Sequence, residues 1–199
     1  MQAVFVTVRS LLVVLLLNLS TGAASAGDLQ VASISGHSAH MPARWMPAAV
    51  AVRSTCGIAG FDERFLELIN RLRIQGAHCG DRGAFRPAAP LGWSARLTVS
   101  ADQHAIDMAT HHNFGHLSRV DGRSVEHRLA AAGLDWGEYA ENLAAGLTTV
   151  EAVVARWSDS PAHCANLMNP NFTEIGAACA PAASAGRFKT YWALDLVGP

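Results

Sequence analysis

The sequence has little excess charge of either sign and no long apolar run beyond its first residues. Its 199 residues include 15 lysines and arginines and 16 aspartates and glutamates, so the formal net charge is -1. A chain this close to neutrality offers no electrostatic basis for binding nucleic acid or an anionic membrane surface. Beyond residue 26, no stretch approaches the roughly 20 apolar residues that a transmembrane helix requires. We therefore expect neither a nucleic-acid partner nor a transmembrane segment in the mature chain.

The N-terminus has the three regions of a secretory signal peptide. Arg9 forms a thin basic region, residues 11–19 form a short apolar core, and residues 24–26 (Ala-Ser-Ala) form a small-residue cleavage signal. A membrane anchor is the alternative, but this apolar core is too short to cross a bilayer. We predict that residues 1–26 are a signal peptide cut after Ala26, and that the mature protein is secreted or periplasmic.

The remaining sequence divides into a lead-in and one domain. Residues 27–56 are rich in alanine, serine and proline and have no apolar period, which predicts a flexible segment. Residues 57–199 are long enough for a single hydrophobic core and contain no internal repeat.

The chain has only four cysteines, and no two of them have the CxxC spacing that is typical of metal-binding thiolates. An even number of cysteines in an exported chain indicates disulfides. Four cysteines allow three pairings. We favour Cys56–Cys79 and Cys164–Cys179, because each closes a short loop around one predicted element, and the second would contribute about 3 kcal/mol on the loop-entropy account.

Apolar periodicity predicts helices first and strands last. A period near 3.6 indicates helices over residues 61–75, 95–112, 124–133, 148–157 and 160–167. The tail alternates instead, over residues 175–179 and 188–196, which predicts a β-hairpin with Trp192 on one face and Tyr191 and Asp195 on the other. This order predicts an α+β fold, with helices packed on a small antiparallel sheet.

Four stretches carry the residues with distinctive chemistry. They are Asn113-Phe-Gly-His116 followed by Asp121-Gly-Arg, Glu141-Asn-Leu-Ala-Ala-Gly146, Trp157-x-x-Ser-Pro-x-His163-Cys-x-Asn-Leu-Met168, and Tyr191-Trp-Ala-Leu-Asp. In this order and spacing they resemble the bacterial branch of the CAP superfamily, the group of cysteine-rich secretory proteins, antigen 5 and plant pathogenesis-related 1 proteins. The resemblance covers about residues 61 to 197. It implies an α-β-α sandwich with a cleft into which a tetrad of His and Glu side chains projects.

The resemblance transfers to this chain at two tetrad positions. His116 and Glu141 match the family, whereas Ser160 stands where many relatives have Glu, and Tyr191 stands where they have the Gly-His of the last strand. His163, one turn beyond Ser160, is the usual bacterial feature and is the candidate to complete the cleft. The other domain histidines are expected at the surface or at helix ends: His104, His111, His112 and His127.

Two functions of different classes follow. Some members of the family bind sterols or fatty acids, and others are credited with peptidase or antimicrobial roles. The first function is therefore a binding module for a small apolar or envelope-derived ligand. The second is a metal-dependent hydrolase or peptidase in which His116, Glu141 and His163 hold Zn²⁺ and leave one position for water. Alternatively, these three side chains hydrogen-bond to one another and fasten the helices. No GxSxG elbow is present, and Ser118 lies only two residues from His116, so we favour the non-enzymatic function.

Overall fold

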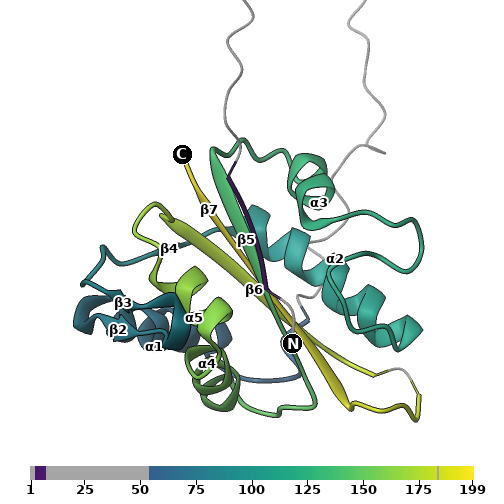
Figure 1. The fold of residues 1–199 in the computed structure, drawn as a ribbon. Coiled ribbons are helices and arrows are strands. Elements are labelled where there is room, and N and C mark those ends of the chain that lie inside the picture. Colours follow the sequence, from purple (N-terminus) through teal and green to yellow (C-terminus); the bar gives the residue numbers. More distant parts are fainter. Residues whose placement is uncertain (1–2, 8–53, 183) are drawn as a thin grey trace, which may run out of the picture. The chain divides into compact units, whose positions relative to one another are not determined.

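The computed structural model describes residues 3–7, 54–182 and 184–199, whose core is a five-stranded sheet in the order β1-β5-β7-β6-β4 (Figure 1). β4 runs parallel to β6, and the other neighbouring pairs are antiparallel. The strands are Ala3–Thr7 (β1), Gly92–Trp93 (β4), Glu138–Ala145 (β5), Glu174–Pro181 (β6) and Thr190–Gly198 (β7), and a separate small sheet pairs Ala77–His78 (β2) with Ala84–Phe85 (β3).

Helices cover both faces of the sheet (Figure 1). α2 packs on β6 and β7, and α3 packs on α2 and β5, whereas α1, α4 and α5 pack together on the opposite face. This arrangement confirms the predicted α+β class and the α-β-α sandwich. None of the described helices is long and apolar enough to cross a membrane. The helices are Phe61–Gln75 (α1), Ala95–His111 (α2), Val125–Ala131 (α3), Val150–Ser158 (α4) and Pro161–Met168 (α5), with a 3-10 turn at Gly80–Arg82 (η2).

The predicted alternation of the last strand decides which side chains meet each helical layer. Trp192 faces α1, where its ring stacks on that of Phe61 with 5.9 Å between centroids. Tyr191 faces α2 and packs in a cluster of mostly small residues. The small side chains let α2 come very close to the sheet: a Cβ on Gly176 of β6 would lie 2.2 Å from the Thr98 amide nitrogen. Glycine is therefore required at this contact.

β5 is the one long strand that the sequence pattern did not predict. All of its residues from Tyr139 to Ala144 are buried, because helices cover both of its faces. A strand buried on both faces shows no apolar–polar alternation. Two of its buried residues, Glu141 and Asn142, are polar, so they also interrupt the continuous apolar run by which a fully buried strand could be recognised.

The predicted leader and lead-in fall only partly within the described residues. Ala3–Thr7, inside the predicted signal peptide, form β1 and pair with β5, with Ala3 opposite Asn142. Cleavage after Ala26 remains a prediction, and it would leave this edge of β5 without β1. Residues 8–53 lie outside the described residues. The last lead-in residues run beside β6, where the amide of Cys179 donates to the Ser54 carbonyl at 2.6 Å.

The disulfides are Cys56–Cys179 and Cys79–Cys164, so the predicted pairing was wrong. Cys56 follows the segment beside β6, which carries Cys179, and the two Cα atoms are 5.3 Å apart. Cys79 precedes η2, which packs on α5, the helix that carries Cys164. The prediction assumed that each disulfide closes a short loop, but the paired cysteines are 123 and 85 residues apart in the sequence. Strand pairing and helix packing bring these distant cysteines together.

Replacing Cys56 and Cys179 together with alanine should lower the free energy of unfolding by about 2–5 kcal/mol, because a cross-link between distant residues restricts the unfolded chain. Urea denaturation of the oxidised proteins measures this difference. Mass mapping of an unreduced digest should recover peptides that join Cys56 to Cys179 and Cys79 to Cys164. A peptide that joins Cys56 to Cys79 would contradict the structure.

Candidate functional site

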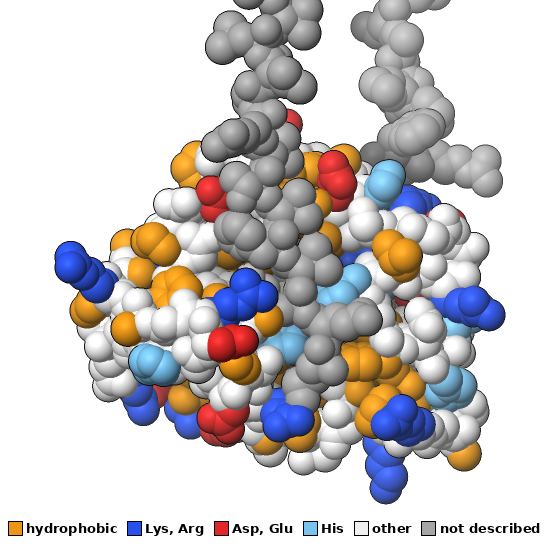
Figure 2. Space-filling model, in the orientation of Figure 1, with side chains coloured by type: hydrophobic (Ala, Val, Ile, Leu, Met, Phe, Trp, Pro, Cys, Tyr) orange, Lys and Arg blue, Asp and Glu red, His pale blue; other side chains and the backbone are white. Residues whose placement is uncertain are grey.

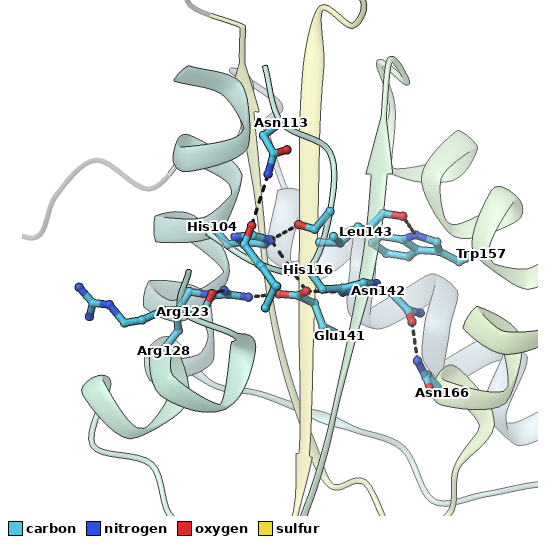
Figure 3. Close-up of polar contacts among 12 residues, drawn as sticks. His104, Asn113, His116, Arg123, Arg128, Glu141, Asn142, Leu143, Trp157 and Asn166 are labelled. Carbon is cyan, nitrogen blue, oxygen red and sulfur yellow. Dashed lines mark hydrogen bonds and ion pairs between the residues drawn. The ribbon is translucent and has the colours of Figure 1, made fainter. Parts of the chain in front are cut away.

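The candidate site is organised by two successive residues of β5 whose side chains point to opposite faces of the sheet. Glu141 points towards α2 and α3, where it meets His116 and Arg128, whereas Asn142 points towards α5 and Asn166 (Figure 3). One strand therefore supports two separate polar groups, one in each helical layer.

Glu141 is fully buried, and both of its carboxylate oxygens are hydrogen-bonded. His116 donates from Nδ1 to Oε2 at 2.6 Å, the Arg128 guanidinium donates to Oε1, and His104 Nε2 lies 3.9 Å from Oε2. Burial raises the pKa of Glu141, but the His116 hydrogen bond and the charge of Arg128, together with the nearby His104, outweigh burial and hold it below its ordinary value. Glu141 is thus an ionised carboxylate in the protein interior.

Three elements beyond β5 supply the partners of Glu141. His116 lies in the loop after α2, Arg128 lies on α3, and His104 lies on the buried face of α2. His104 donates from Nε2 to the Gly115 carbonyl at 2.8 Å, and so holds the loop that carries His116. Burial lowers the pKa of His104, which keeps its ring neutral. The expectation that His104 lies at the surface was wrong, because it shares the inward face of α2 with Leu97, Ala101 and Met108.

Asp195, at the end of the Tyr191-Trp-Ala-Leu-Asp stretch, completes this buried cluster, although it was not among the predicted site residues. It lies on β7 directly opposite Glu141 in the β5–β7 register, and it is fully buried. Burial, and then the negative charge of Glu141, raise the pKa of Asp195 to about 8, although Arg128 acts in the other direction. Near neutral pH Asp195 is therefore protonated, and the pair of carboxyl groups carries one negative charge, balanced by Arg128.

The structure divides the five predicted site residues into three places. His116 and Glu141 are hydrogen-bonded to each other. Ser160 and His163 meet each other in the opposite helical layer, with 2.8 Å between Oγ and Nδ1. Tyr191 lies in the apolar contact between β7 and α2, fully buried, and its hydroxyl has no hydrogen-bond partner among the described residues.

The predicted Zn²⁺ ligands do not form one group. His163 belongs to α5, across the sheet from the pair that His116 forms with Glu141, and the oxygens of Glu141 are already occupied. Among residues 54–182 and 184–199, no three His, Cys, Asp or Glu side chains lie close enough to hold a metal ion. The residues present do not fit a zinc centre, because their side chains come from two helical layers and already bind one another.

A hollow of ≈ 580 Å³ lies near the buried cluster, between the end of α2 and the loop that joins β6 to β7. Phe114, two residues before His116, forms one wall, and its ring meets that of Phe188 edge to face with 5.9 Å between centroids. Two arginines from separate elements, Arg156 of α4 and Arg187 of the loop, complete the lining with His112, Ala144, Ala145 and Leu147. Phe114, Ala144 and Ala145 belong to stretches singled out in the sequence, whereas the other lining residues do not. The arginines come together only in three dimensions.

Residues 66–196 match the family described as "Cysteine-rich secretory protein family". The chain is 29% identical over 119 residues to the uncharacterized protein YkwD of Bacillus subtilis, and 27% identical over 115 residues to the uncharacterized membrane protein YlbC of the same organism. These matches cover 60% and 58% of this chain but only 42% and 30% of the relatives. The chain thus spans less than half the length of the curated relatives it matches.

Two solved structures share the fold at low sequence identity. An extracellular protein containing an SCP domain from Bacillus anthracis aligns with a TM-score of 0.55 and 22% identity, over 69% of this chain and 40% of that one. An outer surface protein from Borrelia burgdorferi aligns with a TM-score of 0.53 and 19% identity, over 70% of this chain and 90% of that one. At these identities the likeness concerns the fold alone.

Substituting Glu141→Gln should lower the free energy of unfolding by about 3–5 kcal/mol, because it leaves the buried Arg128 without its anion. Chemical denaturation at pH 7 measures this loss. Glu174→Gln, at an exposed glutamate of β6, is the matched control and should change stability by less than about 0.5 kcal/mol. Equal stability of the two variants would show that the Glu141 cluster does not hold the fold together.

As pH increases from 4 to 8, the wild type should lose stability at Asp195, whereas an Asp195→Asn variant should not. The free energy of unfolding of the variant should therefore rise relative to that of the wild type over this range. The raised pKa means that the folded state binds the Asp195 proton more tightly than the unfolded state does. The stabilisation from this protonated carboxyl is therefore complete below about pH 4 and is lost as pH rises through 8. The loss approaches about 1.4 kcal/mol per pH unit in that window. Asparagine does not titrate, so parallel stability curves for the two proteins would refute a protonated Asp195.

Proposed function

Because this chain belongs to the cysteine-rich secretory protein (CAP) family, we propose that it acts outside the cytoplasm as a binding module for a small amphipathic anion. Two disulfides support an oxidising location, as does the likeness to proteins described as extracellular and as an outer surface protein. The face shown in Figure 2 has charged side chains of both signs scattered over it, with no broad area of one sign. On this face, therefore, the charges favour a compact charged ligand site over a large charged surface.

The hollow beside α2 is the observation that carries this proposal. Its volume, ≈ 580 Å³, lies in the range of small-molecule sites. The rings of Phe114 and Phe188, together with Leu147 and two alanines, offer apolar walls for a hydrocarbon chain. The buried Glu141 cluster supports one wall, because it fixes the loop that carries Phe114.

Two arginines give the hollow its charge preference. Neither Arg156 nor Arg187 forms an ion pair with another described residue, and the Arg187 guanidinium carbon lies 5.0 Å from the centre of the Phe188 ring. A guanidinium pairs well with carboxylate or phosphate oxygens. The ligand class that fits is therefore a long-chain carboxylate or phosphate, such as a fatty acid or a lysophospholipid. We do not propose the hydrolase, because its three zinc ligands are not assembled and Glu141 is inaccessible.

Displacement of a fluorescent fatty acid tests this proposal. Palmitate and hexadecyl phosphate should displace the probe, and uncharged hexadecanol should do so at least about tenfold less well, because it cannot form a charge-assisted hydrogen bond. The double variant Arg156→Gln/Arg187→Gln should bind palmitate about tenfold more weakly.

Arg119→Gln, at an exposed arginine outside the hollow, is the matched control and should bind like the wild type. Failure of palmitate and hexadecyl phosphate to displace the probe would refute the ligand class. Displacement that the double variant leaves unchanged would refute the site.

A further inference from the structure

A second hollow of ≈ 580 Å³ lies between α5 and the η2–β3 segment, apart from the residues that line the first. We propose that it is a saccharide site that takes an N-acetylated sugar. Its lining is uncharged except for one arginine, and it combines an aromatic ring, two methyl groups and three carboxamides: Phe85, Ala162, Ala165, Asn166, Asn169, Asn171 and Arg82.

One face of α5 lines this hollow. Ala162, Ala165 and Asn166 are spaced i, i+3 and i+4, so their side chains lie together on the helix surface. The other face of α5, with Cys164 and Leu167, is buried in the interior. The exposed face thus presents two methyl groups beside a carboxamide.

Asn166 is almost completely buried, and its hydrogen-bond network sets which of its atoms is available. Asn142 Nδ2 donates to the His163 carbonyl at 3.2 Å, so the Asn142 side-chain oxygen must act as an acceptor. That oxygen accepts from Asn166 Nδ2 at 2.9 Å (Figure 3). The Asn166 side-chain oxygen is then left as an acceptor, and no described residue donates to it. A ligand N–H or O–H can bind there.

A second acceptor stands at the rim. Asn171 donates from Nδ2 to one carboxylate oxygen of Glu138 at 2.9 Å, and Asn169 donates to the other at 3.2 Å. The Asn171 side-chain oxygen has no donor among the described residues. Because the nearby Glu138 carboxylate is negative, a neutral ligand suits this hollow better than an anion.

The opposite wall is held rigidly against α5. Phe85 and Arg82 belong to the segment that follows Cys79, and the Cys79–Cys164 disulfide joins this segment to α5. Gly80 approaches so closely that a Cβ there would lie 2.8 Å from Pro161 Cγ. A site whose walls are fixed before binding loses less entropy when the ligand enters.

An acetamido sugar matches each of these features. Its amide N–H can donate to Asn166 while its methyl group packs on Ala162 and Ala165. Its hydroxyls both donate and accept, so they suit the Asn171 oxygen and the Arg82 guanidinium, and its C–H face can cover the Phe85 ring. An acetylated peptide offers the amide and the methyl group but not the ring of hydroxyls, so the sugar uses more of the site.

Calorimetric titration of the full chain with triacetylchitotriose tests the proposal. We expect saturable binding, at least about tenfold tighter than that of maltotriose, which lacks the acetamido group and its hydrogen bond to Asn166. Phe85→Ala, Arg82→Gln and Asn171→Ala should each weaken binding of the acetylated sugar. All three substitutions are at the surface or partly exposed, so the variants should remain folded.

Two controls separate this site from alternatives. Arg86→Gln, at an exposed arginine outside the lining, should bind like the wild type, and so should the Arg156→Gln/Arg187→Gln variant of the first hollow. Absence of saturable heat, or equal binding by maltotriose, would overturn the proposal. Equal binding by an N-acetylated trialanine amide would overturn it in favour of a peptide ligand.

Discussion

An ionised carboxylate inside a protein is tolerated only when cationic or polar donors satisfy its oxygens. Glu141 meets this condition with donors from two elements other than its own strand, because His116 comes from the loop after α2 and Arg128 from α3. Asp195, opposite Glu141 on the adjacent strand β7, then remains protonated, because a second buried negative charge would repel the first. This single hydrogen-bonded anion fastens one helical layer and its connecting loop to the sheet.

The same cluster encloses the two matched tetrad positions, His116 and Glu141. A group that reacts must reach its substrate, whereas Glu141 and Asp195 are wholly enclosed and His116 is nearly so. The space for a ligand lies beside the cluster, where Phe114 continues the loop that His116 anchors. The loop that His116 anchors thus borders an apolar hollow, and the two arginines at that hollow are the basis of the proposed preference for anions.

The opposite helical layer is organised by different means. There Asn142, the next residue of β5, connects the sheet to α5 through Asn166, and a disulfide fastens the η2 segment to the same helix. Arg73 of α1, also fully buried, donates to the carbonyls of Leu167 and Asn169 and so holds the end of α5. Contacts with β5 and α1, together with the disulfide, thus hold both walls of the second hollow in place, and two of these contacts are made by the lining residues Asn166 and Asn169. Two adjacent residues of one strand therefore support both candidate ligand sites.

The family resemblance grouped His116 with Glu141. Local pattern was sufficient for the helices and the final hairpin, because helical and strand periods are properties of nearby residues. It was insufficient for β5, whose burial on both faces removes alternation. It also missed His104, Arg128 and Asp195, and it paired the cysteines wrongly. Each of these depends on which strands are neighbours and on which helix covers them, since contacts between residues far apart in the chain arise from packing rather than from spacing. The sequence by itself determined the helices, the final hairpin and the family, whereas the tertiary structure decided the strand β5 and which side chains share a site.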